Sequence, residues 1–176
     1  DTGRLEAVGT FPAVPSLMDR GASDGVSGRY VEMHERGELS VMGENTVPPG
    51  PWLAQLVRLL DGADIACIVG DRFRAAEFTE ALDKAGLARV PLMARGFGWK
   101  DGSEDIERFR RALFDGEIAV APSLLLRSAF ADAITLVDPA GNHKLAKARS
   151  LGRIDAAAAT VLAVAEGARR KAAPVR

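Results

Sequence analysis

The 176-residue sequence predicts an α/β domain in which a mixed sheet is flanked by helices. Strand-like and helix-like segments alternate through the second half of the chain, and the first third carries strand-like segments close together. The composition, 47% hydrophobic and 27% charged, is typical of a globular protein with its own core. We interpret residues 1–176 as one domain, with residues 171–176 as a tail.

The clearest core element is the apolar run at residues 65–69, which is typical of a central strand covered on both faces. Asp71 follows just beyond the carboxyl end of this run. Residues 4–11 alternate well enough for a strand, which Pro12 ends. Further strands are predicted at residues 39–42, 90–94, 118–120 and 133–137.

The last predicted helix, at residues 153–171, is rich in alanine, so one of its faces can pack tightly against the sheet. A helical pattern at residues 16–37 is interrupted at residues 21–25. There Asp24 is a candidate N-cap for a helix that Gly37 closes. The other predicted helices span residues 52–60, 74–85, 103–114 and 123–131.

Several classes of protein are excluded by the composition. The single Cys67 rules out a disulfide framework, and one Cys with two His rules out a Cys/His zinc site. No apolar run reaches the roughly 18 residues that a membrane span needs, and no Gly-Lys-Ser/Thr sequence indicates a phosphate-binding loop of the Walker type. The net charge of -1 predicts that any nucleic-acid binding depends on local basic patches. We expect Asp1 to be a cut point within a longer chain, because neither an initiator Met nor a signal peptide is present.

Two carboxylates are predicted at places where ligands collect in α/β proteins. Asp71 follows the predicted central strand, and Asp155 lies in the first turn of the last helix. Taken singly, each has a commoner explanation, Asp71 as a turn residue and Asp155 as a charge favoured by the helix dipole. Together they could hold hard divalent cations, which activate water and stabilise the leaving oxygen in phosphodiester cleavage.

Basic residues gather just before Asp155. Residues 142–154 contain four cations and no acid, which indicates either a solvated loop or a strip that contacts phosphates; the four are Lys144, Lys147, Arg149 and Arg153. A second candidate is the glycine-rich stretch at residues 95–102, where Phe97, Trp99 and Lys100 could touch a nucleic-acid strand.

Over most of its length the sequence resembles the C-terminal nuclease domain of the large terminase subunit of tailed bacteriophages and phage-derived elements. Short motifs in a shared order carry the resemblance, and the most specific of them is an Asp that opens a small-residue helix after a basic loop. The motifs are Thr2-Gly3-Arg4-Leu5-Glu6, Asp24-Gly25-Val26 through Tyr30, Arg36-Gly37-Glu38-Leu39, Val69-Gly70-Asp71-Arg72-Phe73-Arg74, Arg95-Gly96-Phe97-Gly98-Trp99-Lys100-Asp101-Gly102-Ser103, Ala140-Gly141-Asn142-His143-Lys144 and Gly152-Arg153-Ile154-Asp155-Ala156.

The resemblance implies an RNase H-like fold and a metal-dependent endonuclease that cuts concatemeric double-stranded viral DNA with two divalent ions, Mg or Mn. Asp71 matches the second acid of the family's metal site and Asp155 matches the third. The first acid belongs on a strand that is expected ahead of Asp1. We therefore expect weak metal binding and little or no cleavage from residues 1–176 alone.

The implied partners are double-stranded DNA, an upstream ATPase domain of the same protein, the small terminase subunit and the portal. The implied location is the cytoplasm of a bacterial host, away from membranes. One alternative is a catalytically incomplete domain that binds DNA or docks the motor. Another is a small-molecule α/β domain with a nucleotide at its switch point, although its first clear strand is followed by only one glycine, Gly70.

Overall fold

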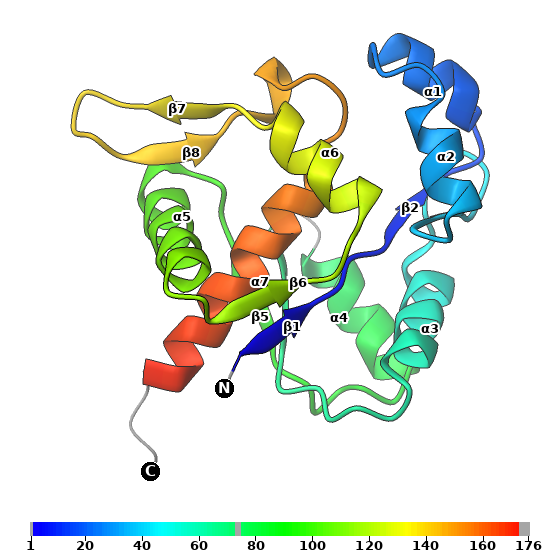
Figure 1. Ribbon diagram of the computed structural model, residues 1–176. Coiled ribbons are helices and arrows are strands. Elements are labelled where there is room, and N and C mark those ends of the chain that lie inside the picture. The colour runs from blue at the N-terminus through cyan, green and yellow to red at the C-terminus, as the bar shows by residue number, and fades with distance from the viewer. Residues whose placement is uncertain (1, 73–74, 173–176) are drawn as a thin grey trace.

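The computed structural model describes residues 2–72 and 75–172, in which short strands alternate with helices (Figure 1). Asp1, Arg74 at the predicted start of a helix, and residues 173–176 of the predicted tail lie outside the described residues. The strands are β1 (Gly3–Leu5), β2 (Gly9–Phe11), β3 (Leu39–Val41), β4 (Ile68–Asp71), β5 (Leu92–Arg95), β6 (Ile118–Val120), β7 (Thr135–Val137) and β8 (His143–Leu145).

The helices cover most of the remaining chain, and none of those described is both long and apolar enough to cross a membrane. They are α1 (Leu17–Ser23), α2 (Arg29–Glu35), α3 (Pro49–Leu60), α4 (Ala75–Lys84), α5 (Trp99–Phe114), α6 (Leu124–Asp132) and α7 (Asp155–Ala172), with the 3₁₀ turn η2 (Lys147–Arg149) before α7.

The strands pair in both directions, as expected for a mixed α/β domain. Within residues 2–72 and 75–172 they form four two-stranded ladders rather than one continuous sheet. The pairs β1–β6, β2–β3 and β4–β5 are parallel, whereas β7 and β8 form an antiparallel hairpin. In the β4–β5 ladder, Ile68 pairs with Leu92 and Asp71 with Arg95.

The strand predicted at residues 65–69 is shifted and less buried than expected. It begins at Ile68, and its apolar residues are only partly buried. The ladder stops there because Pro91 precedes the partner strand and has no N–H to donate; its carbonyl accepts from the Ile68 N–H at 2.9 Å. Asp71 is the last residue of the strand, so the prediction that it marks the carboxyl end is confirmed.

Other boundaries differ from the predictions for similar local reasons. Residues 4–11 form two strands because β1 pairs with β6 and β2 with β3, so the chain changes partner between them. The helix predicted at residues 103–114 begins four residues earlier, at Trp99, with Asp101 in its favourable first turn. Residues 142–154 are not one loop, since they contain β8 and η2.

Helix α7 runs through the middle of the molecule, with α5 and α6 packed against it (Figure 1). It also contacts β4, as predicted. Its alanines Ala157, Ala158 and Ala165 are buried, which confirms that small side chains allow close packing on this helix. Since α7 begins at Asp155, this packing fixes the position of that residue relative to the β4–β5 ladder.

A buried ion cluster joins α7 to the end of β5. The Asp105 carboxylate on α5, with 1% of its side chain exposed, accepts hydrogen bonds from the Arg95 guanidinium, at 2.9 Å, and from Arg169 on α7. Burial alone would lower the pKa of Arg95, but the hydrogen bonds and charge of Asp105 outweigh it and raise that pKa. Each of the three groups therefore has its counter-charge within the cluster.

We expect Asp105→Asn to lower the free energy of unfolding by about 3 kcal/mol, because the partly buried guanidinium of Arg95 loses its paired carboxylate and Arg169 keeps only its pair with Glu166, while the side-chain shape is kept. Urea unfolding followed by circular dichroism measures this. The control is Glu107→Gln, which removes an exposed acid from the same helix and should change the free energy by less than about 0.5 kcal/mol. Equally small effects of the two substitutions would contradict a structural role for the cluster.

Candidate functional site

Asp71 ends β4 with its side chain exposed, directly opposite Arg95 in the ladder. The next residue, Arg72, places its guanidinium 3.6 Å from the Asp101 carboxylate in the first turn of α5. The carboxyl end of the β4–β5 ladder therefore carries acids and a cation together. This is the end of a parallel pair at which ligands are usually bound in α/β proteins.

Asp155 is the first residue of α7, where a carboxylate faces the unpaired N–H groups of the first helical turn. The Lys147 ammonium on η2 donates a hydrogen bond to Asp155 Oδ1 at 2.5 Å, and both side chains are largely exposed. An ammonium group thus neutralises this carboxylate in the structure. The carboxylate is oriented so that it can bind a cation.

Phe97 connects the surroundings of the two acids. The Lys147 ammonium lies 4.9 Å from the centroid of the Phe97 ring. Phe97 follows β5 by two residues, and β5 ends at Arg95, the partner of Asp71. Contacts therefore run from Asp155 through Lys147 to Phe97, which lies two residues beyond the end of β5.

The donor chemistry of this site suits a hard divalent cation, because carboxylate oxygens are the preferred ligands of Mg²⁺ and Mn²⁺. No group of three or more His, Cys, Asp or Glu side chains that could hold a metal is found among the described residues. The convergence of Asp71 and Asp155 on one ion stays a prediction. In the structure the charge of Asp155 is balanced by Lys147.

Arg153 is held by a network that the sequence did not indicate. Its Nε donates to Asp24 Oδ2 at 2.8 Å, and its backbone N–H donates to the Tyr30 hydroxyl at 3.0 Å. The Tyr30 hydroxyl in turn donates to Asp24 Oδ2 at 2.9 Å.

Asp24 is the C-cap of α1, so the prediction that it caps the N-terminus of the next helix is wrong. Gly28 takes that position, and the Asp24 carboxylate is engaged by Tyr30 and Arg153.

The network also shifts two pKa values. Burial, followed by the hydrogen bond to Asp24, raises the pKa of Tyr30 to about 12. The hydrogen bond from Arg153 to Asp24 raises the pKa of the guanidinium. Both groups therefore keep their protons at any physiological pH, and Arg153 is a fixed positive charge next to α7.

The other predicted DNA-binding cations are spread over three elements. Lys144 is on β8, with its ammonium 4.2 Å from the centroid of the Trp99 ring. Lys100 is exposed in the first turn of α5, so the second half of the glycine-rich stretch at residues 95–102 is helical. Arg149 is exposed at the end of η2.

A polar cavity of about 440 Å³ lies beside the start of α7. It brings together three of the predicted residues, Lys147, Arg153 and Asp155, and adds Asp24. Asp71, Lys100, Lys144 and Arg149 are not among its lining residues. Its two acids and two cations form two ion pairs, Lys147 with Asp155 and Arg153 with Asp24.

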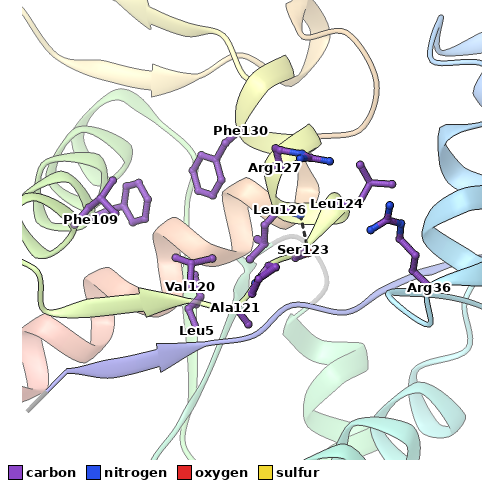
Figure 2. Close-up of a pocket in the computed structure, with 12 residues that line it drawn as sticks. Leu5, Arg36, Phe109, Val120, Ala121, Ser123, Leu124, Leu126, Arg127 and Phe130 are labelled. Atoms are coloured by element: carbon purple, nitrogen blue, oxygen red, sulfur yellow. Dashed lines mark hydrogen bonds between the residues drawn. The ribbon is translucent and has the colours of Figure 1, made fainter.

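A second cavity, of about 550 Å³, is apolar and lies between α5 and α6 above β6 (Figure 2). Figure 2 shows Phe109 and Phe130 facing each other, and their rings are stacked at 5.3 Å between centroids. Its charged lining residues are Arg36 and Arg127, and no carboxylate of the described residues lines it. It therefore lacks the groups that hydrolysis requires, and the polar cavity is the better candidate site.

Sequence reasoning missed Asp24 and Tyr30 as parts of the site. Asp24 is 129 residues away from Arg153 in the chain, and Tyr30 is 123 away, so no local pattern connects them. The signal that could have drawn attention to them is the motif of residues 24–30, which entered the sequence analysis only as part of the resemblance.

Comparison with known proteins gives consistent matches. Residues 29–171 match the family model described as "Terminase large subunit, endonuclease domain". The terminase large subunit of Enterobacteria phage HK97 is 28% identical over 112 residues, which is 64% of this chain and 22% of that protein. The chain therefore spans about a fifth of the length of this curated relative.

Two solved structures share the fold. The HK97 bacteriophage large terminase has a TM-score of 0.79 and 25% identity, covering 89% of this chain and 32% of that one. The large terminase nuclease from thermophilic phage G20c has a TM-score of 0.51 and 19% identity, covering 68% of this chain and 62% of that one. These matches confirm the predicted RNase H-like α/β fold class.

The network around Arg153 can be tested by titrating Tyr30, the single tyrosine of the sequence. We expect the phenol absorbance to titrate with a midpoint of about 12. Asp24→Asn should lower the midpoint only part of the way to the ordinary 10.0, because burial, the larger cause, remains. Circular dichroism at each pH defines the range in which the fold is intact. A midpoint near 10 in the folded wild-type chain would contradict the network.

Proposed function

Because this chain belongs to the endonuclease domain family of phage terminase large subunits, we propose that it cuts concatemeric double-stranded DNA by metal-dependent phosphodiester hydrolysis. The observation that carries the proposal is Asp155, an acid at the start of α7 that is paired with a cation at 2.5 Å and lines a polar cavity with basic residues. The family match supports the reaction class, and the charges in the cavity support a phosphate as its occupant.

In this proposal the carboxylates of Asp71 and Asp155 hold Mg²⁺ or Mn²⁺, with two ions in the complete site. The ions, when bound, supply an activated water and stabilise the leaving oxygen. The residues of this chain orient the acids: β4 presents Asp71 at its end, and α7 presents Asp155 at its start.

We further propose that basic residues around the cavity bind the phosphate backbone without reading the bases. Arg153 is the fixed charge, since Asp24 and Tyr30 hold it. Lys144 rests on Trp99 and Lys147 on Phe97, so aromatic rings support both ammonium groups. Arg149 and Lys100 are the other two cations in this proposal, and both are exposed.

The proposed endonuclease function also implies partners and a location. They are double-stranded DNA, an upstream ATPase domain of the same protein, the small terminase subunit and the portal, in the cytoplasm of the bacterial host. The family membership and the likeness to phage terminases support these proposals.

A second candidate is a catalytically incomplete domain that binds DNA or docks the motor. It is favoured by the lack of a group of three metal-ligating side chains among residues 2–72 and 75–172. The two candidates differ in one measurable respect, because only the nuclease requires Asp71 and Asp155 for cleavage.

We expect Asp71→Asn and Asp155→Asn each to reduce metal-dependent cleavage of duplex DNA by at least about 100-fold, because a metal ligand loses its charge. The assay uses the chain extended upstream through the strand expected ahead of Asp1, with Mg²⁺ or Mn²⁺. Asp115→Asn, at an exposed acid at the end of α5, is the matched control and should cut normally. Cleavage by the Asp155→Asn protein at the wild-type rate would refute the nuclease site. An inactive extended chain that still binds DNA would favour the second candidate.

Replacing Lys144, Lys147 and Arg149 together by Ala should weaken DNA binding and flatten its dependence on salt. The slope of log affinity against log salt should fall by about 0.9 for each phosphate that the protein no longer neutralises, so by about 2 to 3 in total. A control triple replacement of Arg58, Lys84 and Arg89, exposed cations on and around α3 and α4, removes the same charge. Equal slopes for the two triple variants would mean that residues 142–154 do not contact phosphates and are simply solvated.

A further inference from the structure

The Lys147 ammonium makes two contacts with residues that are far apart in the sequence. It donates to Asp155 Oδ1 at 2.5 Å and lies 4.9 Å from the Phe97 ring centroid. It also lines the polar cavity together with Arg153. Its side chain is 47% exposed, so there is room for the flexible stem to swing.

A metal ion at Asp155 Oδ1 would compete with the Lys147 ammonium for the same oxygen. Both are cations, and at a separation of about 3 Å they repel each other even where water screens them. A divalent ion that binds this oxygen therefore favours displacement of the ammonium. The displacement is feasible because an exposed ion pair holds its partners only weakly, by no more than about fivefold in an equilibrium constant.

We propose that Lys147 is a positioning residue that holds Asp155 in the metal-free chain and moves onto a DNA phosphate when a divalent ion binds. This inference rests on the proposed metal site at Asp155. Phe97 keeps the released ammonium next to the cavity, because the face of an aromatic ring attracts a cation. A phosphate then offers the ammonium a charge-assisted hydrogen bond in place of the one with Asp155.

The neighbouring Arg153 has the opposite role. Its side chain is as exposed as the Lys147 side chain, but its partner differs. Asp24 is 15% exposed and also accepts a hydrogen bond from the Tyr30 hydroxyl, whereas Asp155 is 64% exposed, so the pair of Arg153 and Asp24 is the more firmly anchored of the two. One fixed and one exchangeable cation therefore share the cavity. Because metal frees Lys147 for DNA, and DNA draws Lys147 away from Asp155, each ligand should strengthen the binding of the other.

Mn²⁺ binding to the 176-residue chain, measured by titration calorimetry or electron paramagnetic resonance, tests this without any need for catalysis. In the absence of DNA, Lys147→Met should bind Mn²⁺ about two- to fivefold more tightly than the wild type, because the competing cation is gone. Lys147→Arg retains a cation and should stay near the wild type. Lys84→Met is the matched control, since Lys84 pairs with Glu80 at the same 2.5 Å on α4, and it should have no effect.

A short DNA duplex added to the titration supplies the second readout. DNA should raise the Mn²⁺ affinity of the wild type. The increase should be clearly smaller for Lys147→Met. Unchanged or weaker Mn²⁺ binding by a folded Lys147→Met chain would overturn the role of Lys147 and leave the metal site standing. If the Asp155→Asn chain bound Mn²⁺ with the same affinity as the wild type, the proposed metal site would be overturned, and this inference with it.

Discussion

The buried carboxylate of Asp105 is the interaction on which the arrangement of the site depends. It binds Arg95 at the end of β5 and Arg169 on α7, so one acid fixes a strand and a helix that are far apart in the chain. Arg95 pairs in register with Asp71, and α7 begins with Asp155. The cluster therefore fixes the relative positions of the two elements that present the candidate metal ligands.

The two ion pairs of the polar cavity differ in how firmly they are held. The pair of Arg153 and Asp24 is reinforced by Tyr30, whose pKa of about 12 reflects its burial and its hydrogen bond to Asp24. The pair of Lys147 and Asp155 is exposed, and its additional support comes from the ring of Phe97 rather than from a buried hydroxyl. Our proposals use this difference, with the more firmly held Arg153 orienting phosphate and the exposed Lys147 making way for metal.

Local pattern predicted those parts of the molecule that local interactions determine. The strand at residues 118–120 is confirmed without change, the helix predicted at residues 123–131 is found as α6 within one residue at each end, and Asp71 ends its strand. The predicted start of β4 was wrong because the start depends on the partner strand, where Pro91 ends the ladder. Asp105 resembled any acid of an amphipathic helix, because its partner Arg169 is 64 residues away. Position and charge along the sequence singled out Asp71, Asp155 and the basic residues, the family resemblance gave the two acids their expected role, and the network around Arg153 came from the structure.

The central claim is that Asp71 and Asp155 hold divalent metal, and anomalous X-ray diffraction from crystals of the chain soaked in Mn²⁺ tests it most directly. The account predicts an anomalous peak at about 2.1–2.3 Å from carboxylate oxygens of both residues, with the Lys147 ammonium moved away from Asp155. Manganese bound elsewhere, with Asp155 still paired to Lys147, would contradict it.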